Sequence, residues 1–173
     1  MKNSFSYMMI AAALTGSAWA VEVSTKLSDV HLCCPNCVKG VQAATANVTG
    51  ATVAVDKEAG TVSLTGPDTA TVQKAADAIV AAGYFGKSSD PRIKVAAHTG
   101  AKGRKVHALK VEGVHLCCGK CVTAVDKAVK SVPGVKSHTA AKDAKSFEVT
   151  GDFKEKEVFA ALQKAGFAGI AGK

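Results

Sequence analysis

Six cysteines are the residues of this 173-residue chain whose types and spacing suit chemistry, and they fall in two short phrases. The first phrase is HLCCPNCV at residues 31–38, and the second is HLCCGKCV at residues 115–122. Thiolates and imidazoles bind soft transition metals, whereas paired cysteines also form structural disulfides or carry out thiol–disulfide exchange. A disulfide staple, a redox catalyst and a metal site are therefore the competing interpretations.

A structural disulfide framework fits this arrangement poorly. Stapled small domains carry an even number of cysteines spread along the chain, whereas here three thiols crowd into each phrase. Any pairing inside one phrase leaves a thiol over, and neighbours such as Cys33 and Cys34 rarely pair with each other. A bridge between Cys34 and Cys37 remains compatible with the sequence.

The second half of each phrase runs into a helical pattern of valines at three- and four-residue spacing. This pattern predicts that Cys37 and Cys121 lie in the first turn of a helix, with Cys34 and Cys118 just before it. Free N–H groups and the helix dipole stabilise anions there, which lowers thiol pKa values and favours thiolates. Two such thiolates can converge on one soft cation.

An internal duplication explains why the phrase occurs twice. Shifting the chain by 84 residues superimposes His31 on His115, and the match continues through the following helical pattern to Gly50 and Gly134. Further on, the segments 82–85 and 165–168 also correspond. Only two copies are present, so the pattern predicts a tandem of small domains rather than a solenoid.

Each copy shows the same order of secondary-structure patterns. Alternating apolar residues predict strands at residues 23–27, 52–55 and 61–64 in the first copy, and at 106–111, 135–140 and 146–149 in the second. Asp152 and Glu155 resemble a capping box for a second helix, and Gly83 and Gly166 suit helix C-termini. Residues 92–96 are a candidate last strand of the first copy.

The order β-α-β-β-α-β predicts an α+β chain of two tandem ferredoxin-like sandwiches joined by a flexible basic linker. We place the first domain at residues 21–88, the linker at 89–104 and the second domain at 105–173.

Residues 1–20 have the pattern of a secretory signal peptide. A lysine at position 2 precedes a short apolar stretch, and Ala18-Trp19-Ala20 matches a cleavage site. The apolar stretch is shorter than the roughly 20 residues of a membrane span. We therefore expect cleavage after Ala20 and a periplasmic or secreted protein that does not span the membrane.

The net charge of +8 comes from scattered lysines, without a basic stripe, stacking aromatics or a recognisable nucleic-acid motif. We expect a solvated basic surface and no nucleic-acid partner. No carboxylate pair, nucleophile triad or phosphate-binding loop is visible either, so we do not expect an enzyme.

The two copies resemble the heavy-metal-associated domain, the module of copper chaperones, metal-pumping ATPases and periplasmic mercury-binding proteins. The family motif is Gly-Met-x-Cys-x-x-Cys, and its metal-binding cysteines correspond to Cys34, Cys37, Cys118 and Cys121. Leucines replace the methionine. Tyr84 and Phe167 fall in the glycine–aromatic segment that the family places near the metal loop, where we expect them to pack rather than to ligate.

Two departures from the family motif widen the candidate ligand set. Cys33 and Cys117 add a third thiol to each phrase, and His31 and His115 replace the family's glycine. The alternatives are a partly buried thiol that behaves as a small hydrophobe and a histidine that faces solvent. Three thiolates, with or without imidazole, suit Zn(II), Cd(II), Pb(II) or Hg(II) as well as Cu(I).

The resemblance implies an exported carrier, chaperone or scavenger of soft metal ions, with Cu(I) or Zn(II) favoured. Such a carrier passes its ion by ligand exchange to a metal transporter or another cysteine-bearing acceptor. The alternative is a thiol–disulfide oxidoreductase that uses Cys34 and Cys37, because a proline between two cysteines is common in redox motifs. A third possibility is an inert binding module whose cysteines are oxidised.

Overall fold

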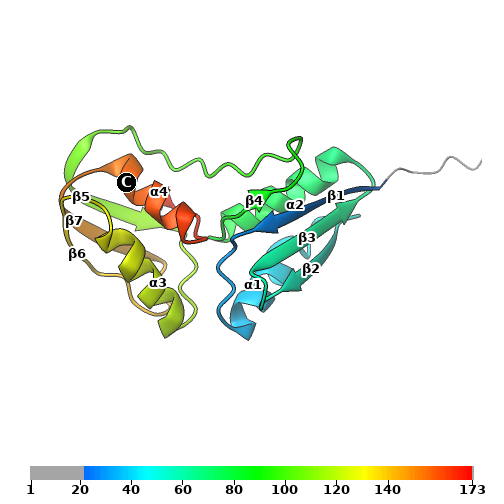
Figure 1. The fold of residues 1–173 in the computed structure, drawn as a ribbon, viewed down its shortest axis with the longest axis horizontal. Helices are drawn as coiled ribbons and strands as arrows, with labels where there is room; N and C mark the ends of the chain where they lie inside the picture. The colour runs from blue at the N-terminus through cyan, green and yellow to red at the C-terminus, as the bar shows by residue number, and fades with distance from the viewer. Residues whose placement is uncertain (1–21, 173) are drawn as a thin grey trace, which may run out of the picture.

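The computed structural model describes residues 22–172, which form two modules, each built from a four-stranded antiparallel sheet and two helices (Figure 1). The proposed signal peptide at residues 1–20 lies outside the described residues. The first module contains β1 (Val23–Ser28), α1 (Pro35–Thr45), β2 (Thr52–Asp56), β3 (Thr61–Gly66), α2 (Thr69–Ala81) and β4 (Lys87–Ser88). The second contains β5 (Lys105–Glu112), α3 (Gly119–Lys130), β6 (Val135–His138), β7 (Ser146–Lys154), α4 (Glu155–Lys164) and β8 (Ile170–Ala171).

The two sheets have the same topology. Their strand orders are β2-β3-β1-β4 and β6-β7-β5-β8, so the first strand of each module is central and pairs with the third and the last. This is the ferredoxin-like arrangement that the order of sequence patterns predicts, and the fold class is confirmed. The valines of the helical patterns, such as Val41 and Val125, are fully buried in the core.

Two local predictions were wrong. The last strand of the first module is Lys87–Ser88 rather than residues 92–96, because Leu27 and Ser28 at the end of β1 pair with Ser88 and Lys87. The predicted capping box is also absent: Asp152 lies in β7, where its carboxylate accepts a 2.6 Å hydrogen bond from the ammonium of Lys105. The residue before α4 is Lys154, which makes no side-chain cap.

The segment between β4 and β5 has no helix or strand, yet it contacts both modules. On the first module, the Gln73 side chain forms hydrogen bonds of 2.8 Å with both the N–H and the carbonyl of Lys94, and Ile93 is buried. On the second module, the carbonyl of Thr99 accepts a 2.7 Å bond from the N–H of Ala171. The segment runs along the helix α2 and α4 side of the molecule in Figure 1.

The modules also meet directly, through the short segments that follow α2 and α4. Tyr84 and Phe167 form an antiparallel bridge. The N–H of Phe85 donates to the carbonyl of Gly166, and the N–H of Ala168 donates to that of Gly83, both at 3.0 Å. This near-symmetric pairing holds the modules face to face, with the loops that lead into α1 and α3 side by side (Figure 1).

Within residues 22–172, the helices are too short or too polar to cross a membrane.

Candidate metal centre

The cysteine loops end at the first turns of α1 and α3, as the valine spacing predicts. Cys34 and Cys118 are the N-cap residues of these helices, both in extended conformation with φ near −156° and −157°. Cys37 and Cys121 lie in the first turn and are fully buried. Neither N-cap side chain caps its helix, so the sulfur atoms are available to other partners.

The sequence predicts one site in each module, whereas the structure brings the two loops into a single cluster. The shortest Sγ–Sγ distances cross between modules. They are 3.4 Å from Cys33 to Cys118, 3.4 Å from Cys33 to Cys121, 3.5 Å from Cys34 to Cys117 and 3.5 Å from Cys37 to Cys117. All six cysteines are free thiols. Cys33 and Cys117 are additional to the two cysteines of the family motif, and both therefore lie within the cluster.

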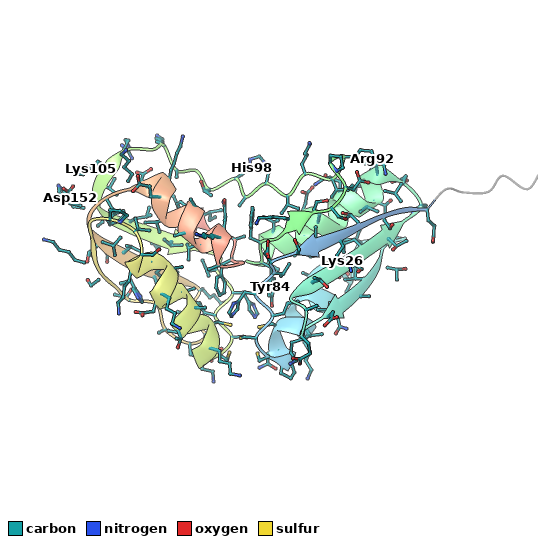
Figure 2. All side chains as sticks on the ribbon, in the orientation of Figure 1. Lys26, Tyr84, Arg92, His98, Lys105 and Asp152 are labelled. Atoms are coloured by element: carbon teal, nitrogen blue, oxygen red, sulfur yellow. The ribbon has the colours of Figure 1, made fainter. Side chains whose placement is uncertain are left out.

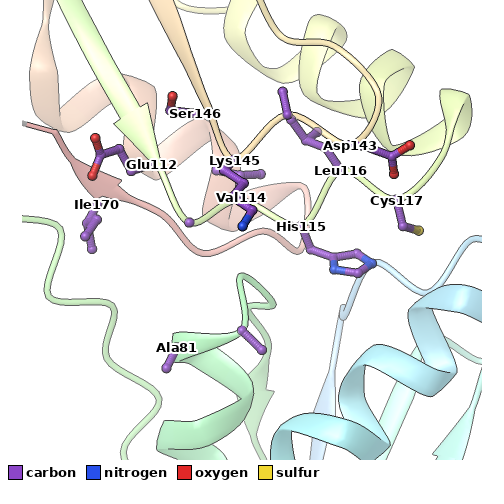
Figure 3. A pocket seen from close by; sticks show the side chains of 13 residues that line it. Ala81, Glu112, Val114, His115, Leu116, Cys117, Asp143, Lys145, Ser146 and Ile170 are labelled. Atoms are coloured by element: carbon purple, nitrogen blue, oxygen red, sulfur yellow. The ribbon is translucent and has the colours of Figure 1, made fainter.

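The two histidines lie at the edges of the same cluster, and each packs against the opposite module. The imidazole of His31 stacks on Phe167, and that of His115 packs against Tyr84, each with a centroid distance of 4.4 Å. Figure 3 shows the ring of His115 extending beyond its own module toward the first. The Nε2 atom of each histidine is buried and has no hydrogen-bond partner. Such buried, unpartnered atoms are rare in folded proteins.

The thiols differ in their tendency to ionise. The thiol of Cys121 donates to Cys37, and together with His115 it lowers the pKa of Cys37 despite burial. Burial opposes ionisation of Cys118, but hydrogen bonds from the backbone of Cys121 and the thiol of Cys33 lower its pKa to about 6. Burial and the neighbouring Cys118 raise the pKa of Cys33 to about 12. The cluster thus favours thiolates at Cys37 and Cys118, whereas donation to Cys37 together with burial holds the pKa of Cys121 well above its usual range.

The cluster is open to the surface on one side. A hollow of about 720 Å³ is lined by Cys34 and Cys118 together with the first two turns of α3. Lys120 and Lys127 also line this hollow. Cys34 and Cys118 are therefore within reach of another molecule on this side, while Cys37 and Cys121 are buried.

Gly83 and Gly166 have a role that the sequence pattern did not reveal. Both have positive φ, +91° and +84°, as expected for glycines after a helix. A Cβ atom on Gly166 would also lie 2.5 Å from the backbone N of His31 and 2.6 Å from the carbonyl of Asp29, and one on Gly83 would lie 2.5 Å from the N of His115. These glycines allow each module to approach the other's cysteine loop.

Tyr84 lies between the two modules (Figure 2), and its hydroxyl donates a 3.0 Å hydrogen bond to the carbonyl of Cys37. Gly40 in α1 makes room for it, because a Cβ there would collide with the hydroxyl. In the second module, Ala124 stands in the place of Gly40 and Phe167 in the place of Tyr84. The module that has a methyl group at the helix position thus lacks the hydroxyl group with which it would collide. Sequence reasoning missed Gly40, although this internal exchange of residues was visible.

Replacing Gly40 with alanine is expected to lower the free energy of unfolding by about 1–3 kcal/mol, because overpacking outweighs the higher helix propensity of alanine. Adding Tyr84→Phe should recover most of that loss, since the colliding oxygen is removed. Urea unfolding of both single variants and the double variant measures the coupling. Simple additivity of the two changes would contradict the proposed contact.

Comparison with known proteins supports this chemistry for one module. Residues 108–168 match the family model of the heavy-metal-associated domain. The matched segment covers almost all of the second module, including Cys117, Cys118 and Cys121. Among curated proteins, no match was found.

A solved structure described as the N-terminal soluble domains of Bacillus subtilis CopA shares 15% identity with the chain. The alignment covers 88% of this chain and 95% of that one, with a TM-score of 0.32. The heavy-metal-associated domain and the cluster of cysteines together indicate binding of soft metal ions.

Proposed function

We propose that this protein is an exported carrier of soft metal ions, and that both modules are heavy-metal-associated domains. The observation that carries the proposal is the convergence of six thiols, with contacts of 3.4–3.9 Å between their sulfur atoms. Thiolate-rich sites select Cu(I), Zn(II) and related ions over Mg²⁺ or Ca²⁺. The 84-residue duplication and the equivalent strand order of the two sheets support the proposal for the first module.

Transfer to an acceptor would proceed by ligand exchange rather than by catalysis. The hollow beside α3 exposes Cys34 and Cys118, so thiolates of a metal transporter or another acceptor would displace these two first. The buried Cys37 and Cys121 would release the ion last. Export rests on the signal-peptide pattern of residues 1–20, and we propose a periplasmic or secreted location.

The double variant Cys34→Ser/Cys118→Ser tests this function. Serine is a preferred N-cap residue, so both helices should still form, and far-ultraviolet circular dichroism checks this. Purified without oxygen, the variant should bind Cu(I) and Zn(II) more than about 100-fold more weakly than the parent, because it lacks direct ligands rather than groups that only support them. Chelator competition measures both affinities.

The matched control is His98→Ala/His107→Ala, which removes two exposed histidines outside the cluster. It should keep the parent's affinity. Unchanged metal binding in the cysteine variant would refute the carrier function. Reduction of a disulfide substrate at a rate that depends on Cys34 alone would instead favour the thiol–disulfide oxidoreductase.

A further inference from the structure

The six thiols and two imidazoles offer more donors than one ion can use. The shortest sulfur–sulfur distances, 3.4–3.6 Å, group the thiols into two sets, and sulfur atoms of different sets approach to 3.8–3.9 Å. In one set, Cys118 and Cys121 lie 3.8 Å apart, and both are 3.4 Å from Cys33. A ring nitrogen of His31 lies within 4.8 Å of both Cys33 and Cys121. This set combines the Cys-x-x-Cys pair of the second module with the His-x-Cys pair of the first.

The other set is its mirror in the duplicated chain. Cys34 and Cys37 lie 3.6 Å apart, and Cys117 lies 3.5 Å from each of them. His115 belongs to the same loop as Cys117, and its ring extends beyond the second module toward the first (Figure 3). Here the Cys-x-x-Cys pair of the first module is joined by the His-x-Cys pair of the second.

These spacings match tetrahedral coordination. With metal–sulfur bonds of about 2.3 Å, two sulfurs of a tetrahedral ion are about 3.8 Å apart, whereas two sulfurs on opposite sides of a linear ion are about 4.6 Å apart. The observed range of 3.4–3.8 Å within the two sets is close to the tetrahedral value. Three thiolates and one imidazole are an established tetrahedral ligand set for Zn(II).

We propose that each Cys-x-x-Cys clamp is completed by the His-x-Cys of the other module, which creates two interlocked Cys₃His sites for Zn(II)-type ions. The buried Nε2 atoms of His31 and His115, which have no hydrogen-bond partner, support the use of imidazole as the fourth donor. This inference rests on the proposed metal-carrier function and specifies its coordination and its ion class.

Shared sites have a mechanical consequence. Because each site draws ligands from both modules, filling either one ties the modules together with metal–ligand bonds. An acceptor must therefore open the interface as well as displace Cys34 or Cys118 before an ion leaves.

Two double variants with the same kinds of residue removed distinguish shared sites from separate ones. Cys33→Ser/Cys118→Ser removes two ligands of one shared set and leaves the other complete. Cys33→Ser/Cys34→Ser removes one ligand from each shared set but leaves the second module's own three cysteines intact. The probes are Zn(II), counted by native mass spectrometry, and Co(II), whose absorption reports tetrahedral thiolate coordination, on residues 21–173 without oxygen.

For shared sites, the parent chain should bind about two Zn(II) ions tightly, Cys33→Ser/Cys118→Ser should keep one, and Cys33→Ser/Cys34→Ser should keep none. Retention of one ion by Cys33→Ser/Cys34→Ser and loss of both by Cys33→Ser/Cys118→Ser would overturn the proposal in favour of one site per module. Equal behaviour of the two variants would also overturn it. If the parent bound neither Zn(II) nor Cu(I), the carrier function itself would fail.

Discussion

Replacing Phe167 with alanine is expected to lower the free energy of unfolding by about 3–5 kcal/mol, the usual cost of removing a buried phenylalanine. Phe167 is 1% exposed, stacks on His31 and forms the bridge to Tyr84. The variant should therefore lose both core packing and the support for the opposite cysteine loop. Urea unfolding measures the first loss, and the rate at which the six thiols react with a disulfide reagent measures the second.

Phe153→Ala is the matched control for this change. Phe153 is equally buried, but it lies in β7 on the core of the second module, and the described aromatic contacts do not include it. Phe153→Ala should lower the free energy of unfolding by a similar amount. Where the variant is folded, its thiols should react with the disulfide reagent as slowly as those of the parent. Equal thiol reactivity in the two variants would show that Phe167 acts in the core alone.

Replacing Gly166 with alanine is expected to separate the modules without unfolding them. The new methyl group would collide with the backbone of residues 29–31, and overpacking of this kind costs about 1–3 kcal/mol. That penalty corresponds to a roughly 5–150-fold shift toward the open arrangement. Small-angle X-ray scattering should show a larger radius of gyration, and the thiols should react correspondingly faster.

Gly50→Ala controls for backbone strain. Gly50 has φ +83°, almost the same as +84° at Gly166, but its added Cβ would lie no closer than 3.6 Å to any neighbour. It should lower stability through strain alone and leave both the radius of gyration and thiol reactivity at the parent's values. A Gly166→Ala variant that behaved like Gly50→Ala would contradict the role of this glycine in docking.

The local structure of the cysteine loops could be predicted because it depends on neighbours in the chain. Valines at helical spacing after Cys37 and Cys121 place these thiols in the first helical turn, and the structure confirms it. The alternating apolar strands and the 84-residue repeat similarly predict the ferredoxin-like order. Where a local pattern was weak the prediction was wrong, as for the last strand near residues 92–96 and the capping box at Asp152.

By itself, the sequence determined that two equivalent βαββαβ modules each present three thiols and a histidine at a helix start. Only the tertiary structure decided that the two loops meet. Their meeting depends on the pairing of residues 83–85 with 166–168, which are more than 80 positions apart, and on glycines that permit backbone contact between modules. Periodicity reports which face of an element is buried, not which other element covers it, and so the single cluster appears only in the folded chain.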